Sequence, residues 1–258
     1  MKKQISIEEL KKIQVEILDD IDSFCKQNHL TYFLIYGSLL GAVRHKGYIP
    51  WDDDIDITMP RKDYEIFCRT FQTEKCYLNN YHNSKDYYHP FSKVIRRGTY
   101  VEEETNYTRS LGINIDIFPM DKLPADKIDR YFKTIFKYGL ILNRKVRFKT
   151  MPLFKKILIV PYLLLHIFQT KKHCLLKMEK NASMYEYGEI ISICPWVKKE
   201  RISSDCFSEI IFLDFENKQY PCPKKYDECL KILYGDYMKF PPENERNSGH
   251  KRKDYIIV

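Results

Sequence analysis

Residues 36–59 read YGSLLGAVRHKGYIPWDDDIDITM, and Pro60 ends the run. Four aspartates fall within five positions, and the chain then becomes apolar. The period-two alternation of a strand would place Ile55, Ile57 and Met59 on a buried face and residues 52, 54 and 56 on the opposite face. Repulsion between like charges disfavours such a group unless a cation or a positively charged ligand binds there.

A metal site is the interpretation that this pattern favours. Hard divalent cations such as Mg²⁺ prefer carboxylate oxygens and keep water or phosphate oxygens as their remaining ligands. The alternative is a solvated acidic turn, as most charge runs are, but here the acids lead directly into an apolar strand. An EF-hand loop starting at Asp52 is excluded, because its sixth and twelfth positions would be Ile57 and Asp63 instead of glycine and glutamate.

A third carboxylate comes from a second strand. In Ile113–Phe118 the isoleucines alternate with Asn114 and Asp116, and we expect Pro119 to end the strand. Together with Asp54 and Asp56, Asp116 could complete a site for two ions about 3.5–4 Å apart, as used for in-line phosphoryl displacement. The alternative for Asp116 is a surface acid on a half-buried strand.

The turn before the aspartates suits a phosphate. Gly37 and Ser38 lie between a predicted strand (31–36) and a short helix (39–44), so they can offer backbone N–H groups and a hydroxyl to a phosphate. Arg44 could neutralise a phosphate oxygen, or it could instead form a salt bridge to Asp52 or Asp53. Walker, dinucleotide-binding and nucleophile-elbow patterns are absent from the sequence.

Elsewhere the periodicity predicts a mixture of helices and strands. Ser6 and Glu9 have the form of a capping box before a helix that should end near Gln27. Helices are expected over 62–71, 126–148, 171–185 and 226–234, with strands at 91–95, 99–101 and 207–213. The amino terminus has no secretory signal, and the cysteines form no Cys-x-x-Cys pair, so we expect a cytoplasmic protein with reduced thiols.

The residues from Tyr36 to Met59 closely resemble the LicD family, which includes phosphocholine transferases and fukutin-related ribitol-phosphate transferases. The resemblance extends to Gly112–Pro119 and to the tail Tyr234–Pro242, with Arg246 and His250 beyond it. It implies an α/β (α+β) nucleotidyltransferase, polymerase-β-like, mixed-sheet core with additional helices.

The resemblance also implies roles for individual residues. Asp54 and Asp56 match the metal-binding pair, and Asp116 matches the third carboxylate, which is also the best candidate for a general base. The matching or neighbouring positions expected to bind substrate or phosphate are Gly37, Ser38, Arg44, Asp52, Asp53, Lys93 and His250. For His250, a loop histidine without a role is the alternative.

The function that this resemblance implies is Mg²⁺-dependent (or Mn²⁺-dependent) transfer of a phospho-alcohol, with phosphocholine favoured. The donor would be a CDP-linked alcohol, the acceptor a glycan or a polyprenyl-diphosphate-linked glycan, and CMP would be released. Two alternatives stay open: a nucleotidyltransferase that moves an NMP group, and a non-enzymatic basic adaptor at a membrane or on nucleic acid. No nucleic-acid partner is expected, because no recognised nucleic-acid-binding fold signature accompanies the charge.

The chain carries a formal charge of +8, and the excess belongs to one segment. Residues 130–178 contain twelve basic and no acidic residues, so the remainder has a charge of −4 (+8 minus +12). We expect a catalytic core with the amino-terminal helix over 1–125, a helical basic segment over 126–200, and strands and a helix that complete the catalytic domain over 201–258. The basic segment also contains an apolar run, Ile157–Phe168. Three interpretations of the basic segment are open: a buried helix pair with solvated lysines, a peripheral contact with the inner face of the cell membrane, or nucleic-acid binding.

Overall fold

The computed structural model describes residues 3–103, 112–142, 152–166, 168–193, 200–248 and 252–257. Helix α1 (Ile7–Gln27) begins and ends where its sequence pattern predicts. The Ser6 hydroxyl accepts from the Glu9 backbone N–H (3.2 Å), and the Glu9 carboxylate accepts from the Ser6 backbone N–H (3.0 Å). This reciprocal cap satisfies two backbone donors that the first turn leaves without helical partners. The apolar face of α1 packs on β5 and β7 of the main sheet.

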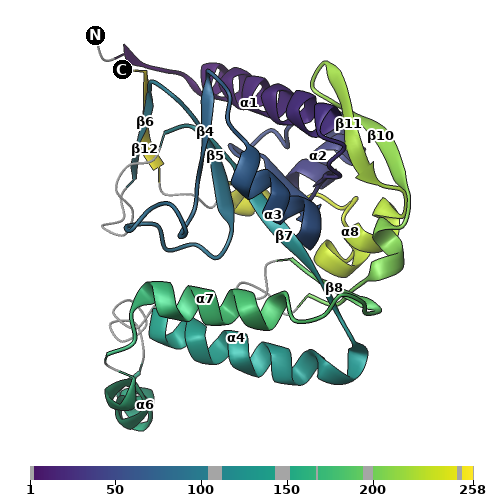
Figure 1. Ribbon diagram of the computed structural model, residues 1–258. Coiled ribbons are helices and arrows are strands. Elements are labelled where there is room, and N and C mark those ends of the chain that lie inside the picture. The colour runs from purple at the N-terminus through teal and green to yellow at the C-terminus, as the bar shows by residue number, and fades with distance from the viewer. Residues whose placement is uncertain are drawn as a thin grey trace.

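The main sheet has the strand order β2-β3-β7-β5-β4, and β8 and β9 extend it beside β7. Strands β3 and β7 run parallel and the other pairs are antiparallel, so the architecture is a mixed α/β fold, as predicted. Helix α3 (Arg61–Thr70) packs against β3 and β7, and α1 runs along the top of the molecule in Figure 1. The bounds of the strands are Phe33–Leu34 (β2), Asp56–Pro60 (β3), Cys76–Asn79 (β4), Ser92–Arg96 (β5), Asn114–Leu123 (β7), Ile190–Ser192 (β8) and Ile202–Ser203 (β9).

Strand β7 is longer than its sequence suggests. The expectation that Pro119 ends this strand is wrong, because the strand continues to Leu123. Pro119 lacks a backbone N–H and is tolerated where no partner requires one. On one side of β7, pairing with β5 stops at Ile117 and pairing with β8 begins at Asp121. Pro119 lies between these two partners.

Three further elements differ from their predicted limits. The strand expected over 31–36 is only Phe33–Leu34, and helix α2 starts early, covering Tyr36–His45. The strand expected at 207–213 is β10 (Ile210–Phe215), because residues 204–207 form a 3₁₀ turn. It forms a hairpin with β11 (Lys218–Pro223), which the sequence analysis did not predict. Helix α8 (Tyr226–Tyr234) has its predicted bounds.

The two ends of the chain meet in a small sheet of their own. In this sheet β12 (Arg252–Ile257) pairs on one side with β1 (Lys3–Gln4) and on the other with β6 (Thr99–Glu103). The ends lie side by side in Figure 1. The last strand therefore returns to the amino-terminal part of the fold.

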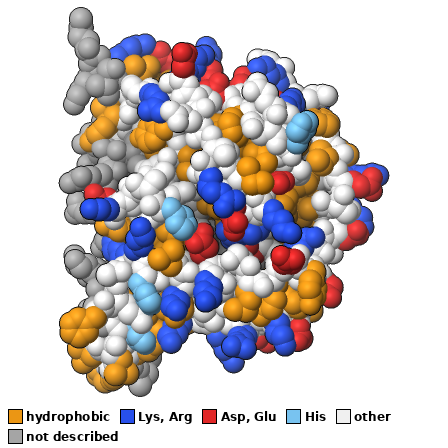
Figure 2. All heavy atoms as spheres, in the orientation of Figure 1, with side chains coloured by type: hydrophobic (Ala, Val, Ile, Leu, Met, Phe, Trp, Pro, Cys, Tyr) orange, Lys and Arg blue, Asp and Glu red, His pale blue; other side chains and the backbone are white. Residues whose placement is uncertain are grey.

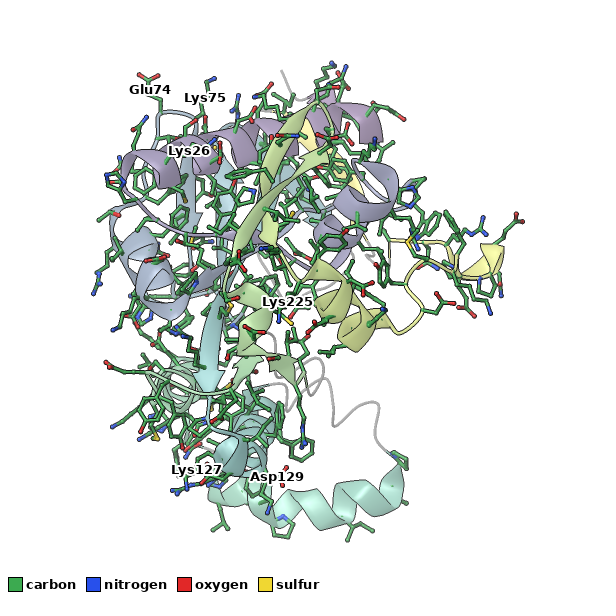
Figure 3. The ribbon with its side chains drawn as sticks, turned by 90° about the vertical axis from the view of Figure 1, so that its right-hand side faces the viewer. Lys26, Glu74, Lys75, Lys127, Asp129 and Lys225 are labelled. Carbon is green, nitrogen blue, oxygen red and sulfur yellow. The ribbon has the colours of Figure 1, made fainter. Side chains whose placement is uncertain are left out.

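The basic segment lies on one side of the sheet. Helices α4 (Ile128–Leu142) and α7 (Lys171–Ala182) pack side by side below it, around a core that includes Tyr131, Phe132 and Met178. The helix expected over 126–148 is described only as far as Leu142. Helix α6 (Leu153–Leu165) lies beyond this pair and forms the lowest rod in Figure 3. Among the described helices, none has both the length and the apolarity needed to cross a bilayer.

Candidate active site

The strand register places three predicted site residues in one row. Asp56 on β3 lies directly opposite Asp116 on β7, and Asp116 in turn lies opposite Lys93 on β5. Residues opposite one another in neighbouring strands point to the same face. Ile55, Ile57 and Met59 are fully buried, so the alternation expected from the sequence is present. Asp116 and Asp56 are therefore neighbours although sixty positions separate them.

The other three aspartates lie together just before β3. Carboxylate oxygens of Asp52, Asp53 and Asp54 are within 4.8 Å of one another. Burial raises the pKa of Asp56 well above its ordinary value, and the charges of Asp54, Asp116 and Asp52 raise it further. Burial, followed by the charge of Asp54, raises the pKa of Asp52 to about 7. The five acids thus repel one another across a single site.

Gly37 and Ser38, in the first turn of α2, contact this group directly. The Ser38 hydroxyl accepts from the backbone N–H of Asp56 (2.8 Å), and its own N–H donates to the Ile35 carbonyl oxygen (3.1 Å). A Cβ added to Gly37 would lie 2.5 Å from Oδ2 of Asp52. In this structure Ser38 positions Asp56, and Gly37 makes room for the Asp52 carboxylate.

Asp53 and Arg44 have partners that the sequence did not predict. The Asp53 carboxylate accepts from the Tyr255 hydroxyl (2.7 Å), which ties the aspartate run to the last strand. A guanidinium N–H of Arg44 donates to the carbonyl oxygen of Tyr237 (2.7 Å). Among the described residues, Arg44 forms no salt bridge with Asp52 or Asp53. The alternative that Arg44 forms a salt bridge to one of these two aspartates is therefore wrong.

Lys93 places a positive charge next to Asp116 in the row of facing residues. Its ammonium group forms an ion pair with Asp116 and donates to the Asn114 side-chain oxygen (3.0 Å). Lys93 is only 8% exposed, so its charge is close to the carboxylates and weakly screened by solvent. Sequence reasoning did not assign Asn114 a role, although its alternation with Asp116 already placed both on one face. His250 lies outside the described residues.

Tyr234, at the end of α8, is a site residue that the sequence analysis missed. Its ring is partly exposed, at 45% for the residue as a whole. Burial of its hydroxyl raises the pKa of Tyr234, and the charges of Asp56, Asp52 and Asp54 raise it further. The hydroxyl therefore remains a neutral hydrogen-bond donor beside the acids. The resemblance of the tail beginning at Tyr234 was the only available signal.

The donor set fits a hard divalent cation. Every candidate ligand is a carboxylate oxygen, which is the chemistry preferred by Mg²⁺ and Mn²⁺. Burial first, and then the charges of Asp54, Asp116 and Asp52, raise the pKa of Asp56, and a bound cation would offset this repulsion between the carboxylates. Among the described residues, Asp52, Asp53 and Asp54 are the acids whose carboxylate oxygens lie close enough together to share one ion, and they lie beside the facing pair Asp56 and Asp116.

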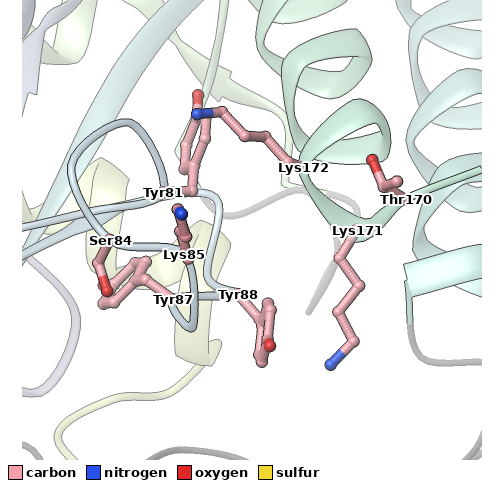
Figure 4. Close-up of a pocket in the computed structure, with 8 residues that line it drawn as sticks. All are labelled: Tyr81, Ser84, Lys85, Tyr87, Tyr88, Thr170, Lys171 and Lys172. Carbon is pink, nitrogen blue, oxygen red and sulfur yellow. The ribbon is translucent and has the colours of Figure 1, made fainter.

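A cavity opens between the loop before β5 and the start of α7. It has a volume of about 240 Å³, and Figure 4 shows its lining. Its cationic residues are Lys85, Lys171 and Lys172, and the ammonium of Lys171 lies 3.4 Å from the centre of the Tyr88 ring. The remaining lining residues are Tyr81, Ser84, Tyr87, Tyr88 and Thr170.

Comparisons with known proteins agree with the motifs. Residues 29–151 match the family described as "LicD/FKTN/FKRP, nucleotidyltransferase domain". The chain is 27% identical to a lipopolysaccharide cholinephosphotransferase LicD of Haemophilus influenzae, over 99% of this chain and the whole of that protein. It is also 39% identical to an uncharacterized protein of Rickettsia typhi, over 24% of this chain and 20% of that protein. A similar match to an uncharacterized protein of Rickettsia prowazekii has 35% identity over 23% of this chain and 26% of that protein.

Proposed function

This chain belongs to the LicD family, and on that premise we propose that it transfers phosphocholine from CDP-choline to a sugar hydroxyl, with release of CMP. The acceptor would be lipopolysaccharide, another cell-surface glycan or its lipid-linked precursor. The observation that carries the proposal is the register of Asp56 opposite Asp116, beside the group formed by Asp52, Asp53 and Asp54. The core would be of the nucleotidyltransferase type. Similarity over the full length to a relative named as a cholinephosphotransferase supports choline as the alcohol.

We assign the following tasks to the chain's own residues. Asp54, Asp56 and Asp116 hold Mg²⁺ or Mn²⁺, which when bound supplies positive charge to the donor diphosphate. Ser38 fixes the backbone at Asp56. Lys93 keeps the Asp116 side chain in place through its ion pair, and its charge favours an anionic substrate.

The transfer itself is a single displacement at the phosphorus distal to cytidine. The acceptor oxygen forms a bond to this phosphorus as the bond to the CMP oxygen breaks, and CMP leaves with that electron pair. The acceptor hydroxyl loses its proton to a base, for which Asp116 is our candidate. No covalent enzyme intermediate is required, because positioning and charge stabilisation supply most of the catalysis in phosphoryl transfer.

Product analysis tests this proposal. Purified protein is incubated with Mg²⁺, a glycan acceptor, and in turn CDP-choline, CDP-ethanolamine, CDP-glycerol and CDP-ribitol, and mass spectrometry follows the nucleotide. We expect CMP release that depends on metal and acceptor and is fastest with CDP-choline. Release of pyrophosphate from CTP would instead indicate NMP transfer. Asp54→Ala and Asp56→Ala should abolish the reaction, and unchanged biological function in both variants would indicate a non-enzymatic adaptor.

We also propose that the protein docks on an anionic membrane surface through α6. The exposed fractions of Leu153 (75%), Ile157 (66%) and Leu165 (82%) are high for apolar residues. Apolar side chains gather at the lower left of Figure 2, where α6 lies, with basic side chains on the neighbouring surface. At thirteen residues α6 is too short to span a bilayer, but an apolar helix flanked by lysines suits the interface.

The lysine-lined cavity would then receive a phosphate of a lipid-linked acceptor. It adjoins the first turn of α7, which follows α6 in the chain, and three ammonium groups favour an anion there. Tyr87 lines this cavity, and burial, followed by the charge of Asp116, raises the pKa of its hydroxyl. One wall of the cavity is therefore close to Asp116.

Vesicle flotation tests the membrane contact. At low salt the protein should float with phosphatidylglycerol-containing vesicles, and to a much smaller extent with phosphatidylcholine vesicles. Leu164→Glu combined with Leu165→Glu should abolish flotation but leave CMP release with a water-soluble acceptor unchanged. Phe212→Glu, at a residue that is 54% exposed on β10, is the matched control and should float normally. Absence of wild-type flotation at low salt would dispose of membrane docking.

A further inference from the structure

Three aromatic rings and two arginines gather beside the aspartate run. The rings of His45, Trp51 and Phe240 are paired at centroid distances of 5.6–6.4 Å and interplanar angles of 62–83°. The Arg44 guanidinium lies 4.6 Å from the Phe240 centroid. That of Arg246 lies 5.5 Å from Trp51 and 5.7 Å from Phe240. We refer to these five residues as the Trp51 cluster.

The cluster adjoins the proposed catalytic carboxylates. Trp51 immediately precedes Asp52, and Arg44 and His45 end α2, whose first turn contacts Asp52 and Asp56. Three extended residues cover at most about 10 Å, so Trp51 and Asp54 are separated by no more than this distance. This separation suits a nucleoside diphosphate whose phosphates lie at the aspartates and whose base lies at the cluster.

The cluster is open to solvent rather than part of the core. Phe240 is 46% exposed, and Trp51 and Arg246 are partly exposed. Aromatic residues whose only task is to fasten the tail to α2 would be expected to be buried. Here they offer ring faces and edges to a ligand beside the reaction site.

The charges decide which ligand fits. Two guanidinium groups already lie over Phe240, so the quaternary ammonium of choline would be repelled from this place. A flat heterocycle can stack on aromatic rings and on guanidinium planes, and such stacking tolerates any base. The base carbonyl oxygen and unprotonated ring nitrogen of cytosine accept hydrogen bonds, and arginine presents a planar fork of donors.

We propose that the Trp51 cluster binds the cytosine base of the nucleotide donor, with Trp51 and Phe240 as stacking surfaces and Arg246 as the hydrogen-bond donor to the base edge. This inference rests on the proposed function, because a CDP-linked donor supplies the base. Arg246 donates through Nε to the Pro241 carbonyl oxygen (2.9 Å). This bond orients its guanidinium. Its Nη1 lies 3.9 Å from a carboxylate oxygen of the exposed Glu243, and a surface ion pair of this kind contributes little, so a base can displace it.

Tryptophan fluorescence tests the assignment without turnover. The sequence contains only two tryptophans, Trp51 and Trp196, so Trp196→Phe leaves Trp51 as the sole reporter. With Mg²⁺ present, CMP should quench this emission saturably, and ribose 5-phosphate at the same concentration should not. A stacked base contributes roughly 10-fold or more to affinity, so Trp51→Leu should raise KM for CDP-choline about tenfold with little change in kcat.

The Arg246→Lys variant tests whether Arg246 recognises the base, as opposed to contributing only its positive charge or only supporting the structure. It keeps the positive charge but loses the planar fork, so it should weaken CMP binding and reduce the preference for CMP over UMP. A purely structural role would alter thermal stability and leave this preference unchanged. Saturable CMP binding, measured by calorimetry, without quenching of Trp51 would overturn the inference. So would an unchanged KM in both Trp51→Leu and Arg246→Lys. In either case metal-dependent CMP release would remain, so the proposed function would stand independently.

Discussion

Replacing Gly37 by alanine tests the position of Asp52 without removing its charge. The added Cβ would lie 2.5 Å from Oδ2 of Asp52, whereas ordinary contacts begin at 3.4 Å, so the carboxylate must retreat by about 0.9 Å. The clashing atom is the end of a side chain, which can rotate at little cost to folding. A displacement of about 1 Å at a reacting site can reduce the rate by roughly 10²-fold. We expect Gly37→Ala to lower kcat/KM by about 10- to 100-fold while the melting temperature changes little.

A double-mutant cycle and a matched glycine make this prediction specific. If the clash with the Asp52 carboxylate causes the loss, Gly37→Ala should have almost no further effect in an Asp52→Ala background, so the two changes will not be additive. For Gly139, within α4, no atom of the described residues lies within 4 Å of an added Cβ. Gly139→Ala should therefore leave activity unchanged and stabilise the protein by up to about 1 kcal/mol. Full additivity of Gly37→Ala and Asp52→Ala in CMP-release kinetics would refute the reasoning.

Three further predictions concern the charges of the site. Asp116→Asn removes a proposed metal ligand and base, so CMP release should fall by roughly 10³-fold or more in a discontinuous assay; activity within tenfold of wild type would contradict its role. Lys93→Met breaks a buried ion pair, which typically costs about 3–5 kcal/mol; urea unfolding should show the loss, and Mg²⁺ should recover part of it because the cation replaces the missing charge. The pKa of Asp52 is raised to about 7 from 3.8, so between pH 3.8 and about 7 the native state holds a proton that the unfolded state has lost. The free energy of unfolding without metal should therefore fall as pH rises through this range. Mg²⁺ should therefore raise the melting temperature more at pH 8 than at pH 5, since protons compete for the carboxylate; an equal rise at both pH values would contradict it.

Local sequence patterns predicted the elements that depend on short-range physics. The capping box at Ser6 and the bounds of α8 follow from hydrogen bonds and periodicity within a few residues. The same alternation placed Asp56 and Asp116 on the strand faces opposite the buried isoleucines. That these two residues face each other depends on which strands pair, and the family resemblance supplied this expectation.

Features that depend on tertiary contacts were not predictable in the same way. Pro119 continues β7 because the partners on one side leave a gap there. The partner of Asp53 is Tyr255, roughly two hundred positions away. Arg44 bonds to the tail instead of to the adjacent acids. In each case a residue's chemistry was clear from the sequence, but its partner was fixed by how distant segments pack.

The three consecutive aspartates have different roles in the structure, and the motif alone does not reveal which residue has which role. The Asp53 carboxylate contributes to the fold by accepting a hydrogen bond from the Tyr255 hydroxyl on β12, the last strand. The Asp52 carboxylate, in contrast, has room only because Gly37 has no side chain. Lys93 adds one positive charge beside Asp116, yet Asp56 still has a strongly raised pKa. The fold therefore retains repulsion between aspartate carboxylates that asparagine side chains at the same positions would have avoided. Such retained strain is typical of functional sites, and here a divalent cation is the ligand that would relieve it. The same repulsion that costs stability in the metal-free protein would thus favour binding of the ion that the proposed chemistry requires.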